Sequence, residues 1–285
     1  MKSADTLRFF RFRSVARRAL ALPLAALFAS VPAQAQTEPP AALQLSGSAT
    51  LTSDYRFRGL SRSDRGTAVQ GSLTLSHESG AYASLLASTV DGWGRAGGAD
   101  AELELTAGYS APLGPVTLDT GITATLFPGG GPDSSLIQPF ASLRGDLGPA
   151  SLRLGAAYAP RQQALGTVPA GEHGRAPSRK GDNLYLWGDL DAALPGTPVT
   201  LRAHLGHSGG SSGLGPSGFA LTPAGAYFDW KLGADIAAGP VTLGVAYVDT
   251  DISRTQAAAI AGFASQGASA SPGAGALLLS ATLGF

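Results

Sequence analysis

The sequence contains no cysteine among its 285 residues. It therefore has no disulfide, no thiolate nucleophile and no cysteine-ligated metal site. Charged residues make up only 14% of the chain, a fraction that excludes a long coiled coil and is unlike that of a charge-rich disordered protein. The final stretch, 255–285, has no charged residue, but Pro272 and several glycines lower its helix propensity, so we do not expect a membrane helix there.

The chain as a whole also lacks an excess of either charge, since its formal net charge is +0 at pH 7. This balance hides an asymmetry, because residues 1–35 hold six basic residues and one acidic residue, which leaves 14 basic and 19 acidic residues in the remainder. A body with that balance has no general attraction for phosphate groups. We therefore expect no nucleic-acid partner.

The first 35 residues have the three parts of a secretory signal peptide. A basic leader precedes an uncharged, mostly apolar run over 19–31, which is too short to span a bilayer as a helix. Ala33-Gln34-Ala35 then supplies the small-x-small pattern at which signal peptidase cuts. The sequence thus predicts export, with a signal peptide over 1–35, a short linker over 36–43 and one domain over 44–285.

The rest of the sequence repeats one theme, a segment of about ten to twelve residues with period-2 hydrophobicity, followed by a turn. In one such segment Ala101, Leu103 and Leu105 alternate with Glu102 and Glu104. Side chains alternate faces along a strand, so this period marks strands with two different environments. The recurrence of the theme predicts an all-β domain of about 12 strands.

The connections between these segments alternate between short and long. The short ones contain Gly and Pro, as tight hairpins require, and cover 78–80, 112–115, 148–150, 194–198 and 238–240. The long ones cover 56–66, 92–99, 128–135, 161–181, 208–225 and 251–273. Outer-membrane barrels have short periplasmic turns and long external loops, and an even number of strands places both chain ends on the periplasmic side. The pattern predicts a transmembrane antiparallel up-and-down β-barrel.

Alternation alone does not say which face points outward, because the apolar face lines a soluble barrel but faces lipid in a membrane barrel. Export favours lipid, and so does the terminal Phe285, which resembles the signature of barrels handled by the outer-membrane assembly machinery. Aromatic residues near the predicted strand ends favour it too, as interfacial girdles do. The residues assigned to the lipid interface are Tyr55, Phe57, Tyr82, Tyr109, Phe127, Tyr158, Tyr247 and Phe285.

One stretch resembles a known family. Residues 52–61, Thr-Ser-Asp-Tyr-Arg-Phe-Arg-Gly-Leu-Ser, with Asp64 and the run Ala-Val-Gln-Gly-Ser over 68–72, resemble the opening hairpin of the TorF family of porins. The resemblance is specific over roughly residues 46–91, and beyond them it rests on the rhythm of hairpins and the terminal Phe. It implies an outer-membrane β-barrel with channel function and an undefined solute.

The polar faces of the predicted strands supply charged side chains that would line the barrel interior. Arg56 and Arg58 have two possible roles, as part of a constriction that tunes ion selectivity or as partners of interior carboxylates that fix the hairpin. The second role is favoured, because the lumen is small and charges inside it need partners. The candidate partners are Glu102, Glu104, Asp119, Asp189 and Asp191. The predicted pore-lining residues are Asp54, Arg56, Arg58, Glu102, Glu104, Asp119, Arg144, Asp189, Asp191, Arg202, Asp229 and Lys231.

An enzyme would need a constellation of catalytic groups, and the sequence predicts none. His204, on a polar face, is the one candidate base, and no Gly-x-Ser-x-Gly elbow places a serine in an activating context. His204 and His207 are three residues apart on a strand and face opposite sides, so they do not chelate one metal ion. We expect no catalytic residue, no metal and no cofactor.

Together these features predict a porin-like channel in the outer membrane of a Gram-negative bacterium, for passive diffusion of small hydrophilic solutes or ions. Its expected partners are outer-membrane lipid and lipopolysaccharide, together with the barrel assembly machinery through Phe285. One alternative is a closed structural or adhesive barrel, whose lumen is filled by its own ion pairs. A third interpretation is an outer-membrane hydrolase that uses His204.

Overall fold

The computed structural model describes residues 42–169, 172, 174–177, 179–258 and 271–285. The predicted signal peptide, 1–35, and most of the predicted linker, 36–43, lie outside these residues. Twelve strands form one closed sheet in the described chain: β1 (Leu43–Thr52), β4 (Ala68–His77), β5 (Ala81–Thr89), β6 (Ala101–Leu113), β7 (Val116–Leu126), β8 (Leu136–Leu147), β9 (Ala150–Gln162), β10 (Gly181–Ala193), β11 (Val199–Gly210), β12 (Tyr227–Ala238), β13 (Val241–Thr250) and β14 (Ala276–Gly284).

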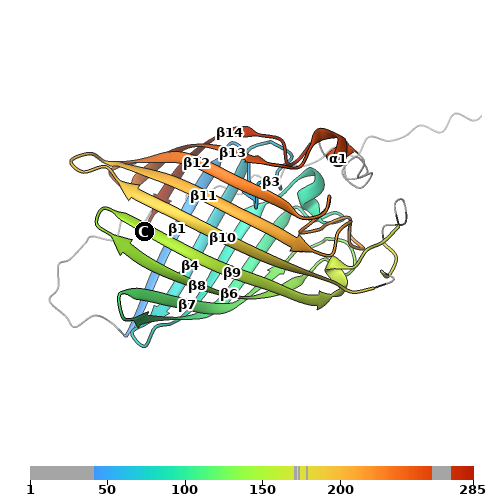
Figure 1. The fold of residues 1–285 in the computed structure, drawn as a ribbon, viewed down its shortest axis with the longest axis horizontal. Coiled ribbons are helices and arrows are strands. Elements are labelled where there is room, and N and C mark those ends of the chain that lie inside the picture. The colour runs from blue at the N-terminus through green and yellow to red at the C-terminus, as the bar shows by residue number, and fades with distance from the viewer. Residues whose placement is uncertain (1–41, 170–171, 173, 178, 259–270) are drawn as a thin grey trace, which may run out of the picture. The chain divides into compact units, whose positions relative to one another are not determined.

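Each of these strands pairs antiparallel with the next along the chain, and β14 pairs with β1 to close the sheet. Two further strands, β2 (Arg56–Phe57) and β3 (Leu60–Ser61), form a separate hairpin between β1 and β4. Figure 1 shows the strands running obliquely around the barrel, with tight turns at one end and long loops at the other. The predicted fold, an antiparallel up-and-down barrel of 12 strands, is confirmed.

The two faces of the barrel wall have the environments that the alternation predicts. Leu45, Leu205 and Leu232 point away from the barrel, with exposed fractions of 67%, 56% and 60%. On the inside polar side chains meet across strand pairs, as where the hydroxyl oxygens of Ser48 and Ser72 lie 2.8 Å apart. An apolar outer face and a polar lumen are the arrangement of a transmembrane barrel, in which the apolar side chains contact lipid.

The connections also follow the predicted pattern. At one end tight turns join the strands, and Gly114 and Gly148 both adopt a left-handed backbone with φ 62°, which disfavours any L side chain. At the other end the connections are long and contain the short helices η2 (Gly92–Arg95), η3 (Gln163–Leu165) and α1 (Arg254–Ala258). Within the described residues, no helix is long and apolar enough to cross a membrane.

Aromatic rings cover glycines on both faces of the wall. On the outside Phe285 covers Gly47, and backbone hydrogen bonds of 2.9 and 3.0 Å join the two residues. In the lumen Trp187 covers Gly155, its register partner on β9. A Cβ at either glycine would collide with the ring, so a larger residue there would have to displace the ring. The C-terminal residue is thereby fastened to β1, where the sheet closes.

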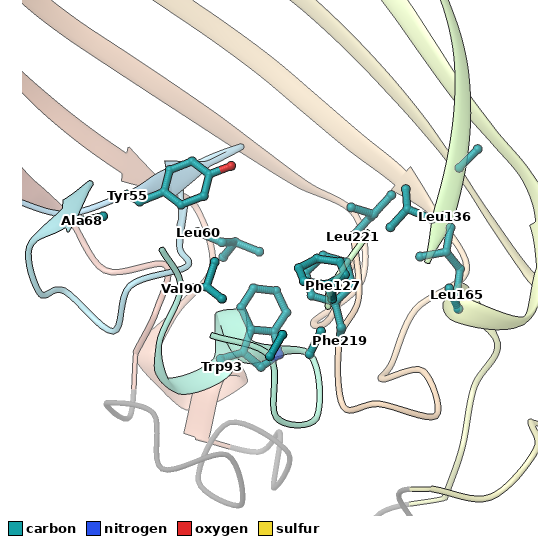
Figure 2. Close-up of a cluster of buried hydrophobic side chains, with 14 of the residues drawn as sticks. Tyr55, Leu60, Ala68, Val90, Trp93, Phe127, Leu136, Leu165, Phe219 and Leu221 are labelled. Atoms are coloured by element: carbon teal, nitrogen blue, oxygen red, sulfur yellow. The ribbon is translucent and has the colours of Figure 1, made fainter. Parts of the chain in front are cut away.

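A hydrophobic cluster lies among the long loops. Trp93 and Phe219 stack with their ring centroids 5.2 Å apart, and Phe127 packs on Phe219 at the same distance. The Trp93 indole donates a hydrogen bond of 2.8 Å to the carbonyl oxygen of Gly218. Figure 2 shows side chains from several loops and strand ends converging on this centre.

The cluster spans the loop end of the barrel. Its buried members include Ala68 at the start of β4, Leu136 at the start of β8 and Tyr227 at the start of β12, so it draws on widely separated parts of the ring of strands. Leu60 of the β2–β3 hairpin belongs to it as well. The cluster therefore joins the long loops to the loop-end residues of several strands, across this end of the barrel.

The outer face of the wall should not tolerate charge. Leu232→Arg would place a guanidinium among lipid chains, which cannot hydrate it. We expect the free energy of unfolding in lipid vesicles to fall by about 2–4 kcal/mol. Leu232→Met keeps an apolar side chain of similar volume and should cost less than about 1.5 kcal/mol. Equal losses for the two variants would contradict a lipid-facing position.

Candidate functional site

The β2–β3 hairpin leaves the barrel wall and folds into the lumen. Its strands are joined by a two-residue turn in which Arg58 (φ 50°) and Gly59 (φ 75°) are both left-handed, as in the type I′ turns that fit tight hairpins. Gly59 lies against Asp229 of β12 and Thr250 of β13, so the tip of the hairpin reaches the inner face of the wall. The side chain of Arg58 in this turn therefore faces the lumen from the loop end of the barrel.

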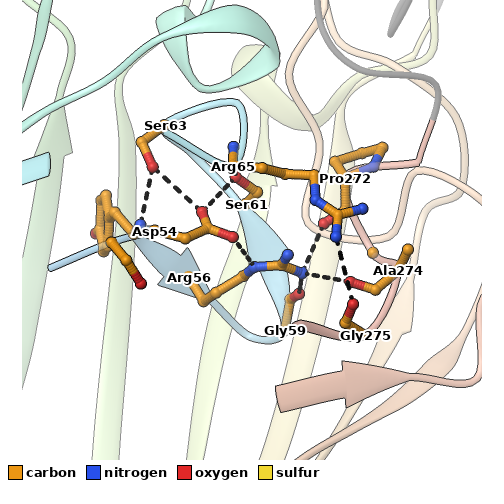
Figure 3. A network of polar contacts seen from close by, with 12 residues as sticks. Asp54, Arg56, Gly59, Ser61, Ser63, Arg65, Pro272, Ala274 and Gly275 are labelled. Carbon is orange, nitrogen blue, oxygen red and sulfur yellow. Dashed lines mark hydrogen bonds and ion pairs between the residues drawn. The ribbon is translucent and has the colours of Figure 1, made fainter. Parts of the chain in front are cut away.

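Asp54 and Arg56 hold the base of the hairpin (Figure 3). Arg56 Nε donates to Asp54 Oδ2 over 2.6 Å, and the two side chains are 3% and 5% exposed. Ser61 Oγ donates to the other carboxylate oxygen of Asp54 over 2.6 Å. Arg56 Nη1 donates over 2.9 to 3.0 Å to three backbone carbonyls, those of Gly59, Pro272 and Ala274. The pair thus ties the hairpin to the loop that precedes β14.

Arg62 and Glu102 form a second buried ion pair, between the end of the hairpin and β6, with side chains 1% and 0% exposed. The Arg62 guanidinium lies 3.7 Å from the centroid of the Phe57 ring. Tyr55 donates its hydroxyl proton to Glu102 Oε1 over 3.1 Å. Burial raises the pKa of the Tyr55 phenol well above its usual value, so the hydroxyl remains a donor. This pair anchors the hairpin beside the hydrophobic cluster.

Below the hairpin the lumen holds a chamber of about 670 Å³ that is lined by charged, polar and apolar side chains. The hairpin and every barrel strand contribute to its lining. Carboxylates and basic groups face each other across it, including Glu104, Asp119, Arg153 and Lys231. The chamber is therefore a property of the whole closed wall and not of one loop.

Water reaches the chamber from the turn end. The exposed fraction of lumenal side chains rises from 3% at Asp229 to 19% at His204, 35% at Asp189, 45% at Arg202 and 57% at Arg144. This order follows the strands from the loop end towards the tight turns. The hairpin and the hydrophobic cluster thus close one end of the lumen, while the other end is open to solvent.

A hydrogen-bond network occupies one side of the chamber, on β10, β11 and β12. His204 Nδ1 lies 2.6 Å from Asp189 Oδ1, and His204 Nε2 lies 2.9 Å from the hydroxyl oxygen of Tyr185. Tyr185 donates to Asp229 Oδ2 over 3.0 Å. The imidazole is thus surrounded by a phenol and two carboxylates, none of which is an activated nucleophile.

In the described chain this network lacks the serine of a Ser–His hydrolase site, although it does place His204 beside Asp189 and Asp229. Within the described chain, no serine or threonine hydroxyl makes a hydrogen bond to His204. In the same residues no group of three or more His, Cys, Asp or Glu side chains is arranged to hold a metal ion. His204, the candidate base, is therefore one of the polar side chains on the lumenal face of the wall.

The predicted pore-lining residues occupy three places. Those that line the chamber are Asp54, Arg56, Arg58, Glu104, Asp119, Asp189, Asp229 and Lys231. Glu102 is buried in its ion pair with Arg62. The others lie towards the turn end, where Arg202 is 3.2 Å from Asp191 and 2.5 Å from Asp235, and Arg144 is 3.9 Å from Asp146.

The predicted partners of the hairpin arginines were wrong. Arg56 pairs with Asp54, two residues away, and not with Glu102, Glu104, Asp119, Asp189 or Asp191. Arg58 pairs with none of these carboxylates and instead donates to the amide oxygens of Asn183 and Gln138. The reason is that β1 ends at Thr52, so the hairpin folds back on itself and the alternation of the wall no longer applies.

Four aromatic residues assigned to the lipid interface lie inside instead. Tyr55 and Phe127 are buried in the loop cluster, with exposed fractions of 8% and 5%, and Phe57 packs against the same cluster. Tyr82 points into the chamber, where it donates to Asp119 Oδ1 over 2.8 Å. The remaining four are exposed by 44 to 70% and stand on the outer face: Tyr109, Tyr158, Tyr247 and Phe285.

Several neutral residues of the site were missed by sequence reasoning. Tyr185, Trp187 and Gln138 line the chamber, and Asn183 holds Arg58. The alternation does place Tyr185 and Trp187 on a polar face, but the predicted pore-lining residues are all charged and these two are not. A search for any hydrogen-bonding or aromatic side chain on that face would have found them.

Some solved structures resemble this chain at low identity. A porin is 12% identical, with a TM-score of 0.40, over 85% of this chain and 100% of that one. An outer-membrane channel from Pseudomonas putida F1 is 12% identical, with a TM-score of 0.43, over 88% of this chain and 100% of that one. LpxR from Salmonella typhimurium is 6% identical, with a TM-score of 0.40, over 84% of this chain and 99% of that one. These likenesses are too distant to carry an argument about function.

No curated protein matches the sequence. None of the comparisons confirms the TorF family, so that resemblance stays a prediction. The profile of a family described as "Bacterial protein of unknown function (Gcw_chp)" matches residues 36–271. Because this match covers most of the chain, the protein belongs to the Gcw_chp family.

Proposed function

We propose that this protein is an outer-membrane, porin-like channel for small hydrophilic solutes or ions, whose external mouth is closed at rest by its own loops. The observation that carries the proposal is a solvent-accessible chamber of about 670 Å³, lined in part by charged side chains, inside a wall with an apolar outer face. A barrel that served only as an anchor would gain nothing from a hydrated cavity lined with charged groups, because such groups are costly to enclose.

The orientation follows from the connections. Short turns lie on the periplasmic side of outer-membrane barrels and long loops on the external side. The chamber then opens to the periplasm, and the hydrophobic cluster faces the outside. Lipid and lipopolysaccharide would cover the apolar outer face, with Tyr109, Tyr158 and Tyr247 near its edges. The exposed terminal Phe285 would be available to the barrel assembly machinery.

A closed structural or adhesive barrel is the second candidate. The observation that favours it is the loop cluster, which seals one end of the lumen with residues such as Trp93 and Phe219 that are 2% and 1% exposed. The two candidates differ in whether the loops can open. An enzymatic role that uses a Ser–His pair has less support, because His204 has carboxylate and phenol neighbours but no adjacent serine hydroxyl in the described residues.

In planar lipid bilayers, the purified and folded protein is expected to give small, brief conductance steps, because the closed state dominates. Protein unfolded by heat before addition serves as the control and should leave the baseline unchanged. The same measurement is made on a variant whose hairpin has been replaced, as described below. If neither folded protein conducts above the baseline, the channel is excluded and the closed barrel is favoured.

A further inference from the structure

The cations that face the lumen have carboxylate partners, with two exceptions. A buried charge without a partner is costly, and proteins normally supply a counter-charge. In the described chain the paired lumenal arginines are Arg56 with Asp54, Arg62 with Glu102, Arg144 with Asp146, Arg153 with Asp119, and Arg202 with Asp191 and Asp235. Arg58 and Lys231, which both line the chamber, have no ion pair within 4.0 Å among these residues.

Arg58 is held in place by neutral groups. Its Nη1 donates to Asn183 Oδ1 over 2.8 Å and its Nη2 to Gln138 Oε1 over 3.3 Å, while its guanidinium carbon lies 4.0 Å from the centroid of the Tyr185 ring. Tyr227 donates a hydrogen bond of 3.0 Å to the Arg58 carbonyl oxygen. A guanidinium has five N–H donors, so most of the Arg58 donors remain for a ligand. Burial lowers the pKa of Arg58, and this effect outweighs the opposing influence of Asp229.

Two carboxylates of the neighbouring wall, those of Asp229 and Asp189, are already engaged. A third, Glu104, also lines the chamber and acts electrostatically on Arg58, but forms no ion pair with it within 4.0 Å. Asp229 accepts from Tyr185 and lies 3.2 Å from His204 Nε2, and Asp189 lies 2.6 Å from His204 Nδ1. Lys231 is two residues beyond Asp229 on the same face of β12. It is exposed to solvent and acts electrostatically on Asp189, but it makes no hydrogen bond and no ion pair within 4.0 Å to any described residue. Arg58 at the closed end, and the solvent-exposed Lys231 nearer the turn end, thus have no carboxylate within ion-pair distance among the described residues.

We propose that the chamber binds the carboxylate of a small organic solute, with Arg58 at the closed end as the main ligand and Lys231, nearer the turn end, as the second cation. A planar carboxylate matches the fork of a guanidinium. The chamber of about 670 Å³ suits a small molecule. Phe140, Trp187, Val248 and Leu278 line the same space and would contact the apolar body of the solute.

A carboxylate fits this site better than a phosphate does. Asp189 and Asp229 face the same chamber, and they would repel the second negative charge that a phosphate carries near neutral pH. This inference rests on the proposed function, since it names the class of solute that the channel would carry. Binding can nevertheless be measured apart from conduction.

The test is isothermal titration of the folded, full-length protein in detergent micelles with hexanoate, with its neutral analogue hexanamide, and with inorganic phosphate. We expect hexanoate to bind more tightly than either of the other two compounds. Arg58→Gln, which keeps two amide donors but removes the charge, should weaken hexanoate binding by at least about tenfold. Lys231→Gln should weaken it by a smaller factor.

Arg161→Gln is the matched control, because Arg161 is 77% exposed and its nearest carboxylate partner, Asp182, lies 3.8 Å away. It should bind hexanoate as the parent protein does. Equal affinity for hexanoate and hexanamide, or an Arg58→Gln variant that is folded and binds normally, would overturn the inference. Tighter binding of phosphate would also overturn it. If hexanoate binds through Arg58 but no variant conducts, the proposed channel fails and the carboxylate site stands.

Discussion

Replacing residues 54–66 by a short Gly–Ser turn is expected to raise the single-channel conductance several-fold. The hairpin closes the chamber from the loop end, and Leu60 and Tyr55 belong to the cluster that seals the mouth. Without it the chamber would be open at both ends. The wall should survive, because Thr52 and Ala68 are register partners of β1 and β4, and a tight turn can join them directly.

The replacement also removes Arg62, the partner of Glu102, but water entering the opened lumen would hydrate the carboxylate. A Gly–Ser replacement of residues 194–198, in the turn between β10 and β11 at the open end, is the control. It should leave the conductance at the parent value. A folded hairpin variant with the parent conductance would show that the hairpin is not the barrier, and it would remove the main support for a channel that is closed at rest.

The barrel wall was predictable from the sequence because each strand has lipid on one face and the polar lumen on the other. Lipid on one side and a polar lumen on the other impose a strict period of two, which is visible in Leu45 and Leu51 of β1 and in Leu103 and Leu105 of β6. The glycines and prolines of the tight turns then fix where each strand ends. No knowledge of distant contacts is needed for either signal.

The hairpin was not predictable by the same reasoning. Tyr55 and Phe57 stand at odd positions, like the outward-facing Leu45 and Leu51 of β1. However, the chain leaves the wall after Thr52, and beyond that point the alternation of odd and even positions no longer indicates which side chains face lipid. The position of Tyr82 was predicted wrongly for another reason. Apolar residues occur on both faces of β5, where Leu85 and Leu86 are adjacent, so the alternation does not identify the lumenal side.

The partners within the site depend on contacts between loops that are far apart in sequence. Gly94 of η2 lies so close to the carbonyl oxygen of Arg62 that a Cβ there would collide with it, and the backbone nitrogen of Asp91 donates to the same oxygen over 2.9 Å. Nothing in either segment marks the other as its neighbour. The sequence therefore predicted many of the charged residues that face the lumen, but not which of them meet.

The second large effect is expected at the buried ion pair of Arg62 and Glu102. Arg62→Met removes the cation and leaves a carboxylate that is 0% exposed without its charge partner. Breaking a buried pair on one side typically costs about 3–5 kcal/mol. We expect the free energy of unfolding, measured by urea titration in lipid vesicles, to fall by that amount. Loosened loops should also make the long connections more sensitive to protease.

The double variant Arg62→Met with Glu102→Gln separates charge from packing. The amide keeps an acceptor for the Tyr55 hydroxyl, which donates to this side chain over 3.1 Å, while removing the unpaired charge. It should recover most of the stability, because a buried pair can often be replaced by neutral groups at little cost. Arg144→Met is the matched control, since its pair with Asp146 is 3.9 Å long and exposed, and an exposed pair contributes about 0–1 kcal/mol. If Arg62→Met costs no more than Arg144→Met, the pair does not anchor the hairpin, and the loop cluster alone must hold the mouth closed.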